Sequence, residues 1–304
     1  MCTAITLRSD PGEQFFGRNM DFSYPIIPQF FIIPNFYQWS NTLNQMQMTD
    51  TYRFIGIGQK VDNLLGFFDG VNEKGFAAAV LYFPDYVKYD DESVGKYAIA
   101  SIDFLHYLLG NCDSVERLPE VLENVIVVGT PDPVTNSIAP LHWMATDRSG
   151  ACVVLEATGN GIEIIDNPIG VMANSPDFKW HMTNLRNYMA ASPIQKEKAV
   201  WDAVTLKPFG QAGGTSLLPG GFTSPERFVR AAYLKSNIQT PADDKEAIIA
   251  CFHIMESVSI PKGAVKTSRD TYDYTKYTAF INTNTCEYFY KGYDDLGVTS
   301  ISLS

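Results

Sequence analysis

The segment that most restricts how this chain of 304 residues can fold is the uninterrupted apolar run Phe76–Phe83, FAAAVLYF. A run that is apolar throughout is typical of a strand covered on both faces, because a strand with one wet face alternates between polar and apolar residues. The polar turn Asn72–Gly75 joins it to the apolar segment Phe67–Val71, which predicts a hairpin. We therefore expect a sheet inside the molecule, with further elements packed against both of its faces.

The order of the remaining predicted elements narrows the fold class. The other predicted strands are Cys2–Leu7, Gln14–Met20, Tyr52–Ile57, Leu141–Thr146, Ala151–Ala157, Ile162–Asp166, Tyr277–Thr283, Cys286–Lys291 and Val298–Leu303. The predicted helices are Ala98–Leu109, Ser114–Glu123, Asp177–Ala190, Ser224–Lys235 and Asp243–Ser257, with a Gly- and Pro-rich loop at Lys207–Gly221. Strands and helices in blocks, without strict βαβ alternation, predict an α+β fold with helices on largely antiparallel sheets. No linker, repeat or low-complexity stretch divides residues 1–304, so we expect a single domain.

The charge of the chain excludes some classes of function. The formal net charge is −11 and no run is rich in Lys or Arg, which argues against a nucleic-acid partner. No stretch approaches 18 consecutive apolar residues, so we expect no membrane span. The first residues lack the basic and apolar regions of a signal peptide, and we expect a cytoplasmic protein.

Cysteine and histidine usage gives no sign of a metal site. The five cysteines are scattered, odd in number and without a C-x-x-C pair, so neither a disulfide framework nor zinc is predicted. We expect Cys152 and Cys251, which lie in apolar runs, to be buried. His106 and His253 lie on apolar helix faces and are interpreted as packed core residues. A Cys–His dyad stays possible, but no local signature supports it.

Cys2 is the one cysteine with a special position, because only Met1 precedes it. Removal of Met1 leaves a thiol and a free α-amine on one residue. The ordinary pKa of such an amine is roughly 7.7–8.0, so it can accept the thiol proton at neutral pH. The resulting thiolate can attack an amide carbonyl. Taken alone, a cysteine at the second position is more often incidental.

Arg18 and Asp21 lie together in the otherwise apolar segment FFGRNMDFSY. Buried charges need partners, and a mutual salt bridge would be the simplest arrangement. In a catalytic site, the guanidinium would stabilise the Cys2 thiolate and the carboxylate would hold the α-ammonium. A spacing of three puts the two side chains on opposite faces of a regular strand. Both would reach Cys2 only if the strand ends or bends between them.

Six blocks of the sequence resemble the choloylglycine hydrolase family, which contains penicillin V acylases and conjugated bile salt hydrolases. They are MCTAITL, GRNMDFSY, DGVNEKGFAAAVLYFP, GVMANSPDFKWHMTNL, LPGGFTSPERFVRAAY and SIPKGAV, in family order. The resemblance covers nearly the whole chain. It implies an αββα four-layer sandwich of the N-terminal-nucleophile hydrolase type that cleaves non-peptide C–N amide bonds, with no metal or cofactor.

The same resemblance assigns site residues by motif. It implies that Cys2 is the nucleophile, that Arg18 lies against its sulfur and that Asp21 orients the α-amine. It also implies that Asn174 is an oxyanion donor and that Arg227 completes the polar site. Considered alone, Asn174 can be explained as a turn residue and Arg227 as a solvated charge on a helix. Because both occur together with Cys2, these purely structural explanations are poor.

Tyr82 and Met20 are the expected substrate-binding residues. Tyr82 is also expected to supply a backbone N–H to the oxyanion, while Met20 is expected to line the acyl pocket or simply to fill the core. Penicillin V acylases tend to carry tyrosine at this point of the motif and bile salt hydrolases asparagine. The main expectation is thus a penicillin V acylase that releases an aryloxyacetyl-type group through a thioester, with a small-molecule amide as substrate.

Several alternatives stay open. Within the enzyme class they are a conjugated bile salt hydrolase and an N-acyl homoserine lactone acylase. From another class, the chain could be a catalytically silent ligand-binding homologue that retains Met1. The segment Pro193–Pro219 resembles the assembly loop of the family, so a homotetramer is expected. Ala173 and Gly221 replace a frequent threonine and a usual aspartate, and the second change is expected to alter the partners of Arg227.

Overall fold

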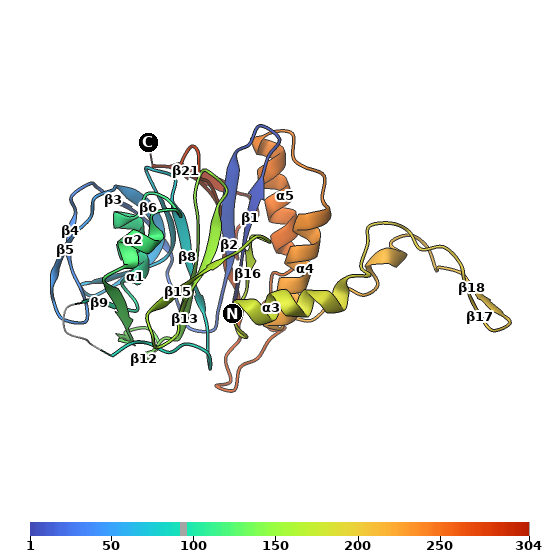
Figure 1. The fold of residues 1–304 in the computed structure, drawn as a ribbon, viewed down its shortest axis with the longest axis horizontal. Coiled ribbons are helices and arrows are strands. Elements are labelled where there is room, and N and C mark those ends of the chain that lie inside the picture. Colours follow the sequence, from blue (N-terminus) through green and yellow to red (C-terminus); the bar gives the residue numbers. More distant parts are fainter. Residues whose placement is uncertain (92–95, 304) are drawn as a thin grey trace.

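Two antiparallel sheets lie face to face at the centre of the structure, a computed structural model that describes residues 1–91 and 96–303 (Figure 1). In this part of the chain, the strand order of the first sheet is β16 (Val171–Met172), β1 (Cys2–Arg8), β2 (Gln14–Phe22), β19 (Tyr274–Asn282), β20 (Glu287–Gly292) and β21 (Thr299–Ser302). The order of the second sheet is β15 (Ile162–Asp166), β14 (Cys152–Ala157), β13 (Leu141–Thr146), β8 (Ala77–Tyr82), β7 (Leu64–Asn72), β6 (Phe54–Val61) and β3 (Gln29–Ile33).

Helices cover the outer faces of both sheets. The second sheet is covered by α1 (Phe104–Asn111) and α2 (Leu118–Leu122), and the first by α4 (Ser224–Asn237) and α5 (Asp244–Glu256). A third helix, α3 (Phe178–Asn184), packs on α4 and continues into a 3-10 turn. The expected α+β fold with four αββα layers is confirmed. None of the helices in the described residues is long and apolar enough to cross a membrane.

The central strand β8 explains why the apolar run has no polar face. Ala77 and Ala79 belong to the core that also holds residues of the first sheet. Ala78, between them, belongs to the core formed with α1 and α2. Because successive side chains of a strand point to opposite faces, one short strand supplies both cores. The expectation of a strand covered on both faces is confirmed.

Two helix predictions need correction. Within Ala98–Leu109, the first residues form β9 (Tyr97–Ala100), which pairs in parallel with β10 (Val125–Val128), and the helix begins only at Phe104. Strand pairing at a distance of some 25 residues overrides the local helical pattern there. Within Ser114–Glu123, only α2 is helical; Pro119 lies in its first turn, where a missing backbone N–H costs nothing.

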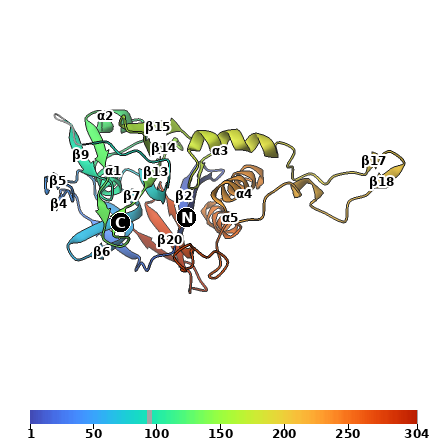
Figure 2. The ribbon, with the colours of Figure 1, turned by 90° about the horizontal axis from the view of Figure 1, so that it is seen from below.

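The structure also differs from the sequence predictions in three short hairpins and in one helix cap. Short hairpins that the sequence analysis did not predict are β4 (Gln38–Ser40) with β5 (Gln47–Thr49), β11 (Pro131–Asp132) with β12 (Ser137–Ile138), and β17 (Ala199–Trp201) with β18 (Val204–Leu206). The last of these forms the tip of an arm that projects from the body in both views (Figures 1 and 2). The sequence predicts Ser224, which is followed by Pro225, as the cap of α4. The cap is instead Thr223, because Thr223 and Glu226 form a capping box.

The two histidines expected in the core differ. His106 is buried and its Nε2 lies 2.9 Å from the Asp50 carboxylate, as expected of a packed core residue. His253 is instead exposed on α5 near Glu256, so its expected burial is wrong. The apolar face of α5 is formed by its neighbours Phe252 and Ile254, which leaves His253 on the solvent side.

Candidate active site

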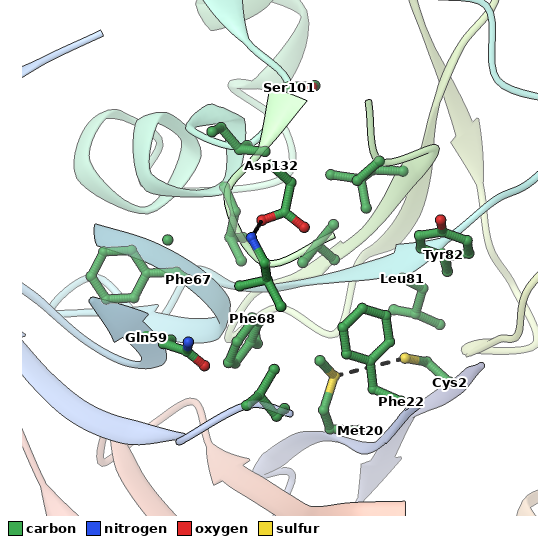
Figure 3. A pocket seen from close by; sticks show the side chains of 18 of the residues that line it. Cys2, Met20, Phe22, Gln59, Phe67, Phe68, Leu81, Tyr82, Ser101 and Asp132 are labelled. Atoms are coloured by element: carbon green, nitrogen blue, oxygen red, sulfur yellow. Dashed lines mark hydrogen bonds between the residues drawn. The ribbon is translucent and has the colours of Figure 1, made fainter. Parts of the chain in front are cut away.

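The candidate nucleophile lies at the first residue of a central strand. β1 begins at Cys2 and pairs with β2 in a register that sets Cys2 opposite Met20. The Cys2 side chain is buried and lines one side of a pocket formed by residues of both sheets and of α1 (Figure 3). Arg18 Nη2 donates to Cys2 Sγ over 2.6 Å and to Met20 Sδ over 3.0 Å. Arg18 thus lies against the sulfur, and its part in catalysis stays a prediction.

The remaining contacts of Arg18 are backbone carbonyls. β7 pairs with β8 only from Asp69 onward, so the carbonyls of Phe68 and Val80 lie outside that ladder. Arg18 Nη1 donates to these two carbonyls over 2.9 and 2.7 Å. Burial lowers the pKa of Arg18, but the acidic groups around it, with Cys2 acting most strongly, raise that pKa above its ordinary value. The guanidinium is therefore fixed in position and stays charged.

A second group of contacts holds the backbone of Cys2. The Cys2 N–H donates to Asn174 Oδ1 over 2.7 Å, and Arg227 Nη2 donates to the same oxygen over 2.7 Å. Arg227 Nη1 also donates to the Cys2 carbonyl, and to Thr3 Oγ1 over 2.5 Å. Arg227 is fully buried, so it is not a solvated helix charge. Sulfur and backbone of Cys2 are thus held by different arginines.

The side-chain amide of Asn174 and the backbone of Tyr82 face each other. Asn174 Nδ2 donates to the Tyr82 carbonyl over 2.7 Å, which leaves its second N–H for another acceptor. Within a strand, the N–H and C=O of one residue point to one side and those of the next residue to the other. Phe83 donates its N–H to the Pro140 carbonyl, so the Tyr82 N–H points the opposite way, toward the side of Asn174. Two donors can therefore converge beside Cys2.

Asp21 lies away from Arg18, and neither the predicted mutual salt bridge nor a break of the strand is found. β2 runs unbroken from Gln14 to Phe22. Asp21 Oδ1 accepts from Thr275 Oγ1 over 2.5 Å, and its Oδ2 lies 3.9 Å from Arg227 Nη1. Burial raises the pKa of the Asp21 carboxyl above its ordinary value, although the Arg227 charge opposes this. No bend is needed, because Arg18 contacts the sulfur while Asp21 faces the side of the Arg227 guanidinium.

The amino terminus adds a residue that the sequence analysis missed. Met1 precedes Cys2 in this structure, and its ammonium donates to the Asp21 carbonyl over 2.9 Å. It also lies 3.2 Å from Asp273 Oδ2, in an ion pair. Within the described chain, Asp21 Oδ2 and Asp273 Oδ1 are buried without a hydrogen-bond partner. No local pattern pointed to Asp273, which reaches the site only because β19 pairs with β2.

His181 supports Asn174 instead of contacting the thiol. Its Nε2 lies 2.8 Å from the Asn174 carbonyl, and its ring stacks on Phe228 with centroids 4.6 Å apart. Burial lowers the pKa of His181 to about 4, so the ring is neutral at physiological pH and donates from Nε2. Its location fits a residue that positions the Asn174 backbone.

The pocket beside the sulfur is mainly apolar, and the cavity inside it measures about 110 Å³. Met20 and Tyr82 both line it, in the places expected for substrate contacts. Figure 3 shows Cys2, Met20 and Phe22 at one side of this space and Asp132 across it. Apolar pockets with a few convergent polar groups are typical of small-molecule sites.

The expected effect of Gly221 on the partners of Arg227 stays a prediction. The Gly221 carbonyl accepts from Arg230 Nη1 over 2.6 Å, and its N–H donates to Glu226. The loop also contacts Arg227, because Arg227 Nε donates to the Phe222 carbonyl over 3.0 Å. The other partners of Arg227 are Cys2, Thr3 and Asn174. Across the residues that the structure describes, no cluster of three His, Cys, Asp or Glu side chains could hold a metal ion.

The sequence of this chain is similar to that of known proteins. A family model described as linear amide C–N hydrolases, choloylglycine hydrolase family, matches residues 2–304. The bile salt hydrolase/transferase of Clostridium perfringens (strain 13 / Type A) is 34% identical over 305 residues, covering 100% of this chain and 93% of the relative. The penicillin V acylase of Pectobacterium atrosepticum is 25% identical, covering 93% of this chain and 75% of the relative.

Solved structures give the same picture. The crystal structure of a mutant conjugated bile acid hydrolase from Clostridium perfringens superposes with a TM-score of 0.91 at 34% identity, covering 99% of this chain and 92% of that chain.

Proposed function

Because this chain belongs to the choloylglycine hydrolase family of linear amide C–N hydrolases, we propose that it cleaves conjugated bile salts or closely similar amides. Such a substrate joins a large, rigid, apolar acyl group to a small amine with an anionic tail. The relatives named bile salt hydrolases are more similar to this chain than the penicillin V acylase, which supports the bile salt alternative over our first expectation. The observation that carries the proposal is the apolar pocket that ends at Cys2 Sγ.

The contacts around Cys2 support an N-terminal-nucleophile mechanism. After Met1 is removed, the α-amine of Cys2 accepts the thiol proton, and Sγ attacks the amide carbonyl beside Arg18. The oxyanion accepts hydrogen bonds from Asn174 Nδ2 and from the Tyr82 N–H. The α-ammonium then gives its proton to the leaving nitrogen. Water cleaves the thioester and restores the thiol.

Asn174 and Asp21 fit this sequence of steps through their remaining contacts. Asn174 Oδ1 already accepts from the Cys2 nitrogen, so the amide that holds the nucleophile also presents its N–H to the oxyanion. The unpartnered Asp21 Oδ2 is a ready acceptor for the new α-ammonium, which has more N–H groups than the peptide nitrogen it replaces.

The two sides of the scissile amide meet different surfaces. The acyl group enters the apolar pocket, where Met20 and Phe22 provide contact area. Outside the residues that line the pocket, the Arg269 guanidinium lies 4.1 Å from the centroid of the Tyr24 ring, and that ring packs 5.2 Å from the lining residue Phe22. Arg269 is exposed and supplies a positive charge for an anionic tail, in a chain that is otherwise strongly acidic.

Penicillin V stays the second candidate because of Tyr82. This ring lies half-buried at the pocket, with its centroid 6.3 Å from that of Phe22, and it can pack against a phenoxy group. We expect Tyr82→Asn to change the ratio of catalytic efficiencies in favour of glycocholate, by roughly 5- to 200-fold at most, the scale of a modest contact change of about 1–3 kcal/mol. An unchanged ratio would remove Tyr82 as a determinant.

The experiment that tests the proposal compares glycocholate, taurocholate and penicillin V on one preparation that lacks Met1. The proposal predicts a higher kcat/KM for at least one bile salt than for penicillin V. The reverse order would restore the penicillin V acylase interpretation. No turnover of any of the three, by protein shown by intact mass to begin at Cys2, would favour the silent ligand-binding alternative or another amide.

A further inference from the structure

A buried carboxylate lies close to the site and has no part in the steps above. Asp69, on β7, is 1% exposed. Its Oδ2 accepts from Tyr277 Oη over 2.6 Å and its Oδ1 from Tyr288 Oη over 2.9 Å. Burying an ionised carboxylate is unfavourable unless a charge or several donors compensate. Two tyrosine hydroxyls supply donors but no positive charge.

Arg18 is a buried positive charge that has no carboxylate among its hydrogen-bond partners. Its hydrogen-bond acceptors are carbonyl oxygens and two sulfur atoms, none of which is a carboxylate. The Cys2 sulfur is negative only as a thiolate, and it is neutral both as a thiol and in a thioester. In those two states the guanidinium needs another negative charge. Arg18 Nη1 donates to the backbone carbonyl of Phe68, the residue that precedes Asp69, and the Asp69 charge helps to raise the pKa of Arg18. Among the described residues, the two side chains form no direct ion pair within 4.0 Å.

We propose that Asp69 is a positioning residue that acts through Arg18, as the permanent counter-charge that keeps the guanidinium against the Cys2 sulfur while that sulfur is neutral. The inference rests on the proposed role of Cys2 as nucleophile. It assigns Asp69 no contact with substrate. Thiolate and Asp69 compete for the same guanidinium, so the carboxylate also limits how strongly Arg18 favours the thiolate.

The surroundings of both groups agree with this pairing. The titratable groups that act on Arg18 are Cys2, Tyr277, Asp69 and Asp21, and those around Asp69 are Arg18, Tyr277, Tyr288 and Tyr290. Arg18 is thus the positive charge that acts on Asp69, and Asp69 is one of the acidic groups that act on Arg18. Burial raises the pKa of the Asp69 carboxyl, and the Arg18 charge is the strongest influence that opposes this.

A purely structural role is the competing explanation. Asp69 belongs to the second sheet, whereas Tyr277 and Tyr288 belong to β19 and β20 of the first, so the three residues also join the sheets. The two explanations differ in what should happen when Arg18 loses its charge. A counter-charge becomes unfavourable without its cation, but a clamp between sheets is unaffected.

A double-mutant cycle separates them through urea unfolding of the wild type, Arg18→Gln, Asp69→Asn and the double variant. We expect each single change to lower the unfolding midpoint, and the double change to lower it by clearly less than the sum, because no unpaired charge is left. Tyr288→Phe is the matched control: it removes one bond of the clamp and keeps both charges, so its loss should add to that of Arg18→Gln.

Additive losses in the Arg18/Asp69 cycle would overturn the proposal. If Asp69→Asn alone does not fold, recovery of folding in the double variant supports the proposal, and failure of the double variant to fold contradicts it.

A second measurement reads the sulfur directly, without substrate. The rate of Cys2 alkylation by iodoacetamide is followed against pH on protein that begins at Cys2, with the modified peptide identified by mass. We expect Asp69→Asn to move the midpoint to lower pH by about half a unit to one unit, because the guanidinium then compensates only the thiolate.

Tyr288→Phe, which keeps the carboxylate, should not reproduce that downward shift. An unchanged midpoint in folded Asp69→Asn contradicts the proposal. Because neither measurement uses an amide, a shifted midpoint with no turnover of bile salts would leave this inference standing and remove the proposed substrate.

Discussion

Arg18 and Asp21 show what can and cannot be inferred from spacing at the level of single residues. Three positions apart on a regular strand, they were expected on opposite faces, and β2 places them so. The further expectation of a bend came from assuming that both must reach the same part of Cys2. They do not, because Arg18 contacts the sulfur while Asp21 lies near Arg227, which holds the Cys2 backbone.

Substitution of the nucleophile gives the first prediction at this scale. Cys2→Ala should fold normally and lose amide hydrolysis by about 10⁶-fold, the scale seen when a nucleophile is removed. Cys2→Ser should keep the geometry and still lose most activity, because a hydroxyl is far less acidic than a thiol. Steady-state rates with glycocholate, beside unfolding curves, check both variants. Substantial turnover by Cys2→Ala would exclude Cys2 as nucleophile.

Asp69 and Asp273 mark the limit of sequence reasoning about the site. The six residues predicted to be catalytic lie in motifs, and the structure brings the other five around Cys2. Asp273 lies in a loop with ordinary polar composition, and Asp69 is one acid within an apolar strand. Only the pairing of strands distant in sequence reveals what surrounds them, and a local pattern cannot supply that.

At the level of elements, α3 connects a titratable group to the oxyanion donor. His181, on α3, is neutral and buried, and burial lowers its pKa from 6.5 to about 4. The unfolded chain therefore binds a proton between these values and the folded chain does not. The free energy of unfolding therefore falls as the pH drops from 6.5 through about 4. Over this range the neutral, buried His181 costs the folded state roughly 3 kcal/mol of stability relative to neutral pH.

We predict that His181→Gln, whose amide can still donate to the Asn174 carbonyl, loses less unfolding free energy than the wild type between pH 7 and pH 4. Urea unfolding at several pH values checks this. His253→Gln is the matched control, because it makes the same substitution at an exposed position of α5, away from Asn174. Parallel curves for His181→Gln and the wild type would contradict the assignment.

Elements were predicted best where one periodicity covers the whole segment. The apolar run of β8 and the capped start of α4 were found within one or two residues. The region Ala98–Leu109 was misread because its apolar spacing also suits a strand, and the choice depends on β10, which comes later in the chain. Tertiary pairing of this kind overrides local preference.

At the scale of the whole molecule, both sheets and one of the helices that cover them contribute residues to the site. Cys2 and Arg18 come from the first sheet, Tyr82 from the second, and Arg227 from a covering helix. We therefore propose that residues 1–304 act as one domain, since no single sheet or helix layer holds the site.

The arm that ends in β17 and β18 is the segment that we expect to contact other copies of this chain. It projects from the body, and its side chains Trp201 and Phe209 are 73% and 113% exposed. Exposed apolar surface of this kind typically marks a contact with another chain. We expect a homotetramer in solution and a smaller species after replacement of Lys198–Lys207 by a short Gly-Ser turn, as measured by light scattering. A monomeric wild type would contradict this.

We propose that the free α-amine of Cys2 makes this chain an amide hydrolase. The most direct measurement compares one protein before and after a protease trims a stable extension to leave Cys2 first, with glycocholate as substrate and intact mass as the check on trimming. Blocking the amine as an amide removes its basicity. The account predicts no hydrolysis before trimming and full hydrolysis after it. Equal rates in the two forms would show that another residue is the base and would contradict the account.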